Sequence, residues 1–281
     1  MPPKVLYIIL SQTRAHELTF NKFKQHVLDH LKCDLAVCAS PESKDGDMFT
    51  KTAKYTWFYP EVDDWSVAYD EMFGHKNWRS ILKIKNQVFG GILDENHQHP
   101  GSAGILIFFR WFLLQNLIKN NLIDKYDFFI VSRSDYLYHS NHPLITCNTS
   151  KKYIYIPQGE DYDGITDRYM LVSNENIVHA LSIADNFLSD PDKFIKDTSF
   201  FQSWNLERLI YWHFHKKGLI VKRFPRIMFT VRGQNDETRW TGGEFNKDIN
   251  LIVKYSSEYD LTIASQYRTF YEIDESYKYI L

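Results

Sequence analysis

The sequence predicts an α/β domain that opens with a parallel βαβ unit and ends in an irregular C-terminal part. Its 281 residues are 44% hydrophobic, which is enough to fill one large core. Apolar runs alternate with segments of helical spacing in both halves of the chain. The sequence has no repeat and no low-complexity tract, and we therefore expect residues 1–281 to form a single domain.

The opening segments form the βαβ pattern. Residues 4–10 (KVLYIIL) are a continuous apolar run, 18–31 have helical spacing, and 33–40 (CDLAVCAS) are apolar again. Loops that follow parallel strands gather at one edge of a sheet, where α/β proteins bind ligands. Gln12, Thr13 and Arg14 are therefore predicted to face a ligand crevice.

The middle of the chain is less regular. Residues 55–60 are a strand candidate, and 63–73 and 78–91 are helix candidates. Ser102 is placed to cap a helix over 103–120, whose nearly all-round apolar character predicts burial against the sheet. The segment after it, FFIVSRSDYLY, predicts a buried strand with an exposed, charged tip.

The second half alternates in the same way. Strands are predicted at 152–157 and 168–173, and helices at 175–187 and 203–217, the latter stopped by Gly218. A strand pair is expected around 219–224 and 226–232.

Composition excludes several classes of protein. Lys and Arg number 33 against 35 Asp and Glu, so we expect no nucleic-acid partner. Three cysteines without a CxxC pair indicate neither a disulfide framework nor a zinc site. No apolar run is long enough to insert into a membrane, and no signal-peptide cleavage site follows the first strand, so a cytoplasmic location is predicted. The 16% aromatic content suits sugar rings and uracil, or else an aromatic-rich core.

Asp135 is the strongest candidate for chemistry. With Arg133 it lies at the end of an apolar strand, where a buried charge is costly unless it is paired or binds a ligand. Its carboxylate could bind Mg²⁺ or Mn²⁺ bridging a diphosphate. The alternative is an ion pair with Arg133 that only caps the strand.

Two polar loops supply further candidates. Asp161, Asp163 and Asp167 share one loop, and neighbouring like charges raise a pKa toward that of a general base, unless the loop is simply solvated. Arg232 and Arg239 flank a second loop that could close over phosphates, or they are ordinary surface arginines. Close histidine pairs match no zinc pattern, and P-loop, GxGxxG and GxSxG motifs are absent from the sequence.

Four segments, in order, resemble the GT-A glycosyltransferases of cytoplasmic and viral origin. IILSQTRAHELTFNKFKQHVL is similar to their SGQxR start, and KYDFFIVSRSDYLYHSNHPL to their strand with the pattern YD, apolar residues, R-P-D. GITDRYMLVS is similar to their GxNDRF segment, and TVRGQNDETRW to their late arginine and tryptophan segment. Together the four segments span residues 8–240, and each motif is short and degenerate.

The resemblance implies a GT-A fold, which is Rossmann-like with a mixed, mostly parallel central sheet flanked by helices. It also implies a UDP-sugar donor and a divalent cation. Residues 1–135 would bind the nucleotide-sugar, with Arg14 near the nucleotide and Asp135 in the DxD-like position. Residues 136–281 would bind the acceptor, with Asp167 and Arg168 on that side. A full DxD is missing here, which puts the requirement for Mn²⁺ or Mg²⁺ in doubt.

The overall appearance is similar to capsid-glycan glycosyltransferases of large chlorella viruses, including β-xylosyltransferases. That likeness implies UDP-xylose as donor, a fucose of a viral capsid N-glycan as acceptor, and the host cytoplasm as location. Inverting transfer is expected, with Asp167 first as the base, followed by Asp163, Asp161 and Glu207. The alternatives are a retaining GT-A enzyme with another donor, a non-catalytic carbohydrate-binding protein, and a glycoside hydrolase.

Overall fold

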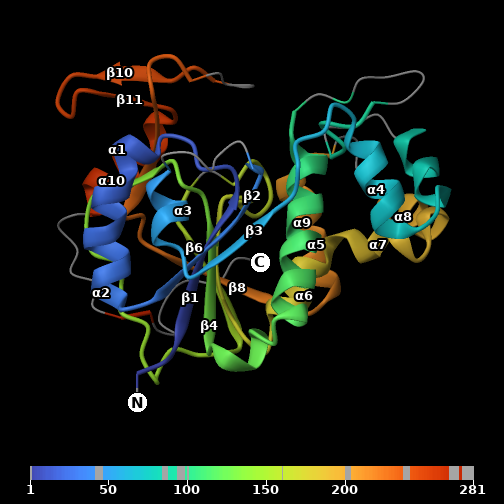
Figure 1. Ribbon diagram of the computed structural model, residues 1–281, viewed down its shortest axis with the longest axis horizontal. Helices are drawn as coiled ribbons and strands as arrows, with labels where there is room; N and C mark the ends of the chain where they lie inside the picture. Colours follow the sequence, from blue (N-terminus) through green and yellow to red (C-terminus); the bar gives the residue numbers. More distant parts are fainter. Residues whose placement is uncertain are drawn as a thin grey trace.

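The computed structural model of the protein is a mixed α/β structure with helices on both sides of a central sheet (Figure 1). It describes residues 2–41, 47–83, 88–93, 99, 101–159, 161–199, 204–236, 241–265 and 272–273. The predicted fold class, a mixed and mostly parallel sheet flanked by helices, is confirmed. No helix among these residues is both long and apolar enough to cross a bilayer.

Among the described residues, the main sheet contains seven strands in the order β3-β2-β1-β4-β7-β6-β8. Strand β7 is antiparallel to both of its neighbours, and the other neighbouring pairs are parallel. The strands are β1 (Val5–Ser11), β2 (Asp34–Ala39), β3 (Tyr55–Phe58), β4 (Phe128–Ser132), β6 (Tyr153–Pro157), β7 (Tyr169–Ser173) and β8 (Ile220–Phe224).

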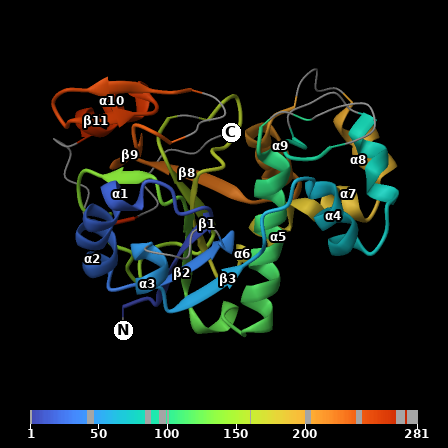
Figure 2. The same ribbon diagram turned by 45° about the horizontal axis from the view of Figure 1, so that its top comes forward.

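Helices cover both faces of this sheet. In Figures 1 and 2, α1 to α3 lie on one side, α5, α6 and α9 lie on the other, and α4, α7 and α8 lie beyond α5 and α9. The α-helices are α1 (His16–Phe23), α2 (Asp29–Leu31), α3 (Met48–Thr52), α4 (Trp65–Phe73), α5 (Ala103–Lys119), α6 (Ile177–Leu181), α7 (Asp185–Leu188), α8 (Pro191–Thr198), α9 (Leu206–Lys216) and α10 (Ser256–Ser265). A π-helical turn, Lys24–Leu28, joins α1 to α2, and 3₁₀ turns occupy Asn77–Lys83, Ile123–Lys125 and Ser182–Ala184.

Strand β1 shows why its sequence is apolar at every position. Leu6 and Ile8 pack in the core cluster that contains Phe109 of α5, whereas Val5 and Tyr7 pack in the cluster that contains α1 residues. Successive side chains of a strand point to opposite faces, so a sheet covered on both sides needs apolar residues throughout. The continuous run is therefore the signature of a doubly covered strand.

A second, smaller sheet lies beside the main one, with the order β10-β11-β9-β5 in the described part of the chain. Its strands are β5 (Tyr136–Tyr138), β9 (Met228–Arg232), β10 (Glu244–Asn246) and β11 (Leu251–Val253). Strand β5 begins immediately after Asp135, so this sheet extends from the tip of β4. In Figure 2, its strand β11 and the helix α10 lie together at the top, next to β9.

Two details of the predicted fold are wrong. Strands β8 and β9 do not pair with each other, because β8 joins β6 in the main sheet and β9 pairs with β5 and β11. Between them Arg226 is fully buried and donates to the carbonyls of Gln158 (2.6 Å) and Gly159 (3.0 Å), which redirects the chain. Ser102 occupies the N-cap position of α5, but its side chain makes no capping hydrogen bond.

Other boundaries agree or differ only in detail. Helix α9 ends before Gly218, whose φ of 67° lies in the left-handed region that glycine adopts without strain. The helix predicted over 175–187 is divided into α6, a 3₁₀ turn and α7. Of the helix predicted over 78–91, the described portion begins as a 3₁₀ turn, and residues 84–87 lie outside the described residues.

Candidate active site

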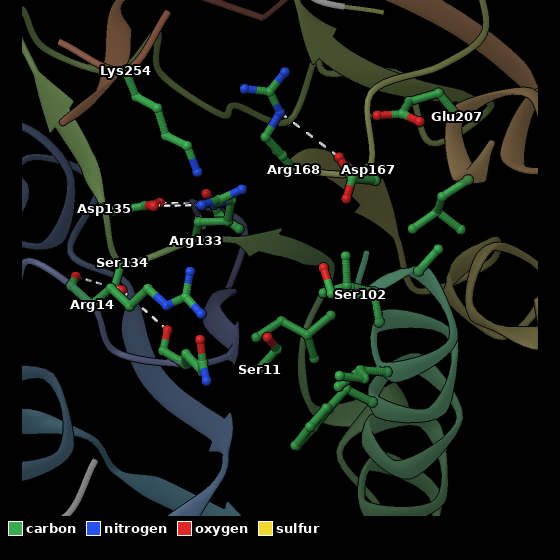
Figure 3. Close-up of a pocket in the computed structure, with 18 of the residues that line it drawn as sticks. Ser11, Arg14, Ser102, Arg133, Ser134, Asp135, Asp167, Arg168, Glu207 and Lys254 are labelled. Carbon is green, nitrogen blue, oxygen red and sulfur yellow. Dashed lines mark hydrogen bonds and ion pairs between the residues drawn. The ribbon is translucent and has the colours of Figure 1, made fainter. Parts of the chain in front are cut away.

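A cavity of about 710 Å³ opens at the edge of the main sheet where β1 and β4 end (Figure 3). These two strands are parallel, so the residues that follow them meet at one edge. Strand β7 is antiparallel to β4, with Tyr169 opposite Ser132, and its amino end therefore reaches the same edge. The topology thus brings residues 133–135 and 167–168 to one cavity.

Asp135 lines this cavity and is held by Arg133. The Arg133 Nε donates to Oδ1 of Asp135 at 2.7 Å, and Nη2 of the same guanidinium donates to Oδ2. Burial acts to raise the pKa of Asp135, but the charge and hydrogen bonds of Arg133, with help from Lys254 and Arg14, lower it below its usual value. The carboxylate is therefore ionised and engaged in the ion pair that the sequence offered as the alternative, while still facing the cavity.

The residues around Asp135 do not fit a divalent cation. Both carboxylate oxygens already accept hydrogen bonds from Arg133, and the other charged neighbours that lower its pKa, Lys254 and Arg14, are also cations. Among the described residues, no group of three or more His, Cys, Asp or Glu side chains could hold a metal ion. A metal at this position would have to share the carboxylate with a guanidinium and sit among like charges.

Arg14, Arg133 and Lys254 line the cavity next to Asp135 and form what we call the cationic wall. The Ser134 hydroxyl lies within hydrogen-bonding distance of the carbonyls of Gln12 (3.1 Å) and Arg14 (2.9 Å), which holds the loop after β1 against the tip of β4. Of the three residues predicted to face a ligand crevice, Gln12 and Arg14 line the cavity, whereas Thr13 is buried and is not part of the lining.

Sequence reasoning missed Lys254. It follows β11, and its amide donates to the carbonyl of Thr230 at 2.8 Å, which places it over the cavity from the small sheet. Burial, together with the positive charge of Arg133, lowers the pKa of Lys254 to about 8. The sequence does contain a signal for Lys254, because it is a charged residue directly after the apolar run LIV. Asp135 was singled out for the same reason, as a charged residue at the end of an apolar strand.

The opposite wall carries two carboxylates, Asp167 and Glu207 (Figure 3). Glu207 lies in the first turn of α9, and Asp167 precedes β7 with its carbonyl oxygen bound by Arg110 Nη2 at 2.5 Å. Burial, and then the negative charge of Asp167, raise the pKa of Glu207 to about 7. This wall therefore contains a carboxyl group that can accept or release a proton near neutral pH.

The loop that contains the other acidic candidates is fixed against α9. Asn205 Nδ2 donates to the carbonyl of Tyr162 at 3.0 Å, and the amide of Ile165 donates to the carbonyl of Glu207 at 3.0 Å. Asp163 pairs with Arg208 at 2.7 Å, and Asp161 pairs with Arg223. Asp161 and Asp163 are thus engaged in ion pairs, and neither is part of the cavity lining.

Gly164 allows this close contact. A Cβ at position 164 would overlap the backbone carbonyl of Glu207 and the amide of Arg208, so no larger residue fits without moving the loop away from α9. Gly164 thereby sets the position of the Glu207 backbone relative to the loop that leads to Asp167.

Arg168 connects the cavity to a buried ion network. Its Nη1 donates to Glu258 Oε1 at 2.9 Å, and Arg226 approaches the same oxygen at 3.0 Å. The other oxygen of Glu258 accepts from the amide and the hydroxyl of Thr230 at 2.8 and 2.7 Å. Arg168 also lies 4.3 Å from the centre of the Tyr255 ring, and Arg168 is therefore held in place on several sides.

Arg232 and Arg239 are the two arginines predicted to bind phosphates from the late loop. Arg232 donates to the carbonyls of Gly242, Gly233 (3.0 Å) and Gln234 (3.2 Å), so it braces its own loop and is not part of the cavity lining. Arg239, the second candidate, lies outside the described residues.

Most of the prominent aromatic residues build the core. Trp65, Trp78 and Tyr69 are fully buried in one cluster. In the described part of the chain, Phe109, Tyr162 and Tyr255 are the aromatic residues that line the cavity. The high aromatic content is therefore explained mainly by packing.

No protein-family model and no curated protein matches the chain. Among solved structures, the chain is similar to mouse xyloside xylosyltransferase 1 in its apo form, with 11% sequence identity and a TM-score of 0.39. The match covers 79% of this chain and 84% of the mouse chain. At this level of similarity no residue role is transferred from that protein.

Proposed function

We propose that the chain is a glycosyltransferase that moves a sugar from a UDP-sugar to a glycan acceptor with inversion at the anomeric carbon. The observation that carries the proposal is the division of one cavity into a cationic wall and a wall with paired carboxylates. Arginine and lysine stabilise a departing diphosphate, and a carboxylate with a pKa near neutrality suits proton abstraction from a hydroxyl. The four motifs that resemble GT-A enzymes support the same function.

In the proposed reaction Glu207 is the general base. Its carboxylate accepts the proton of the acceptor hydroxyl, the hydroxyl oxygen forms a bond to the anomeric carbon, and the bond from that carbon to the diphosphate oxygen breaks. The diphosphate leaves with the bonding electrons beside Arg14 and Lys254. Asp167, the first choice from sequence, is assigned the neighbouring role of raising the pKa of Glu207.

The proposal extends to the donor and acceptor. UDP-xylose as donor and a fucose residue of a capsid N-glycan as acceptor follow from the sequence resemblance to the viral enzymes. The cavity volume of about 710 Å³ is within the range of ligand sites and accommodates a molecule of this class.

The direct test combines binding and product analysis. We expect UDP to raise the melting temperature of the protein, since a ligand that binds only the native state stabilises it. We also expect transfer from UDP-xylose to a fucosylated acceptor, with the β-configuration in the product by NMR. If UDP protects the protein but a different sugar is transferred, only the proposed donor is wrong. A product with retained anomeric configuration would refute the proposed inversion.

A second candidate, a glycoside hydrolase, is favoured by one observation. Paired carboxylates of which one has a raised pKa are also the arrangement that hydrolyses glycosidic bonds. Such an enzyme would cleave aryl glycosides and would gain no stability from UDP. Protection by a glycan, without turnover of either substrate class, would instead identify a carbohydrate-binding protein.

A further inference from the structure

The sequence resemblance implies a divalent cation at Asp135, but the charged side chains that surround Asp135 are themselves cations. Resting on the proposed function, we propose that this cavity binds the diphosphate of its donor through Arg14, Arg133 and Lys254 without a divalent cation. In this arrangement Asp135 is a positioning residue that orients Arg133, and it is not a metal ligand.

Both carboxylate oxygens of Asp135 are already engaged by Arg133, so a divalent cation would have to share them with a guanidinium. The planar guanidinium of Arg133 faces the carboxylate with Nε and Nη2, one donor to each oxygen. Such a two-point contact is directional and strong because both partners are charged. The Asp135 side chain is only 7% exposed, and the contact is therefore shielded from competing water.

Lys254 is a buried cation that lines the cavity. This residue is 8% exposed, and within the described part of the chain its ammonium makes no ion pair within 4.0 Å. Figure 3 shows it extending from the small sheet toward Arg133 and Asp135. Burying an ammonium group without an anionic partner is costly, so a cavity that keeps one here is suited to an anionic ligand.

Arg14, Arg133 and Lys254 are cations and Asp135 is the single carboxylate among these four residues, so the wall has a net positive charge. A diphosphate bridged to a nucleoside and a sugar carries negative charge of similar size. Adding a divalent cation would increase the like-charge repulsion on this wall instead of balancing the ligand.

The experiment measures UDP binding to the full-length protein by calorimetry, once after exhaustive treatment with EDTA and once with millimolar MnCl₂. We expect the two dissociation constants to agree within about 2-fold. Uridine should bind weakly in both conditions, because it lacks the diphosphate that the wall recognises.

Two variants sharpen the test. Lys254→Met keeps the length of the side chain and should weaken metal-free UDP binding about 10- to 100-fold, the loss typical of one charged contact, while uridine binding stays unchanged. Lys247→Met removes the same charge from an exposed position in the turn between β10 and β11 and should leave UDP binding unchanged. Asp135→Asn should lower affinity equally in EDTA and in MnCl₂, because its effect acts through Arg133.

The outcomes separate the inference from the function on which it rests. UDP binding that needs MnCl₂ and is lost in Asp135→Asn would overturn metal-free recognition and leave the glycosyltransferase proposal standing. No UDP binding in either condition would overturn both. If Lys254→Met and Lys247→Met lowered the affinity for UDP equally, the proposed contact between Lys254 and the diphosphate would be rejected. The loss would then reflect only the net charge of the protein.

Discussion

Each of the two walls of the cavity contains a carboxyl group, but the pKa of one is lowered and the pKa of the other is raised. On the cationic wall, Arg133 binds both oxygens of Asp135 in the segment between β4 and β5, and the pKa of that carboxyl is lowered. On the wall formed by β7 and α9, burial and the charge of Asp167 raise the pKa of Glu207 to about 7.

The difference shows how neighbours assign the role of a carboxylate. A guanidinium at hydrogen-bonding distance keeps Asp135 ionised and occupied, which suits an electrostatic or positioning role. A second carboxylate and a low-dielectric environment leave Glu207 able to exchange a proton near neutral pH. The following predictions test whether these two environments separate donor binding from proton transfer.

The largest effect is expected for Glu207→Gln. If Glu207 is the base, the variant should lose transfer activity by about 10²- to 10⁴-fold, while UDP affinity stays close to that of the wild type. Initial rates with saturating donor and acceptor, together with UDP calorimetry, measure the two properties. Glu244→Gln, at an exposed position in β10, is the matched control. If Glu207→Gln still turned over at the wild-type rate, Glu207 would not be the general base.

A smaller loss of activity is expected for Gly164→Ala. The new Cβ would push against the backbone of Glu207 and Arg208 and shift the loop from α9, which should reduce kcat by about 10- to 100-fold. UDP binding, which depends on the other wall, should be preserved. Equal losses of kcat and UDP affinity would mean that the walls are not independent.

The smallest effect is expected for Asp167→Asn, as a shift in pH dependence. The negative charge of Asp167 raises the pKa of Glu207, so its removal should move that pKa down from about 7 toward the ordinary glutamate value. The ascending limb of the rate profile, where the base becomes ionised, should therefore move to lower pH, with the maximal rate within about 10-fold of wild type. Loss of turnover without such a shift would make Asp167 itself the base.

Local patterns predicted the regular part of the fold. The βαβ unit and the buried strand before Asp135 were evident because each depends on the periodicity of a short segment. The antiparallel direction of β7 and the separation of β8 from β9 were not evident, since strand neighbours are chosen by contacts between distant segments. Arg226, buried between β8 and β9, contributes through contacts with the loop after β6 that no local pattern announces.

The candidate site was predicted in part for the same reason. Gln12, Arg14, Arg133 and Asp135 follow strands that sequence could place, and all four line the cavity. Glu207 ranked last among the proposed bases because its raised pKa arises from burial and from Asp167, which are close only in the folded chain. Lys254 was missed because β11, the strand that positions it, has only three residues.

The buried Glu258 sets a limit on how far this chain can be shortened. Its carboxylate lies on α10 and neutralises two guanidiniums, those of Arg168 at the cavity and Arg226 behind it. A fragment ending before α10 would leave both arginines enclosed without their shared counter-charge, at a cost of several kcal/mol. The smallest fragment that keeps a functional cavity must therefore extend past residue 258, although the main sheet ends far earlier in the sequence.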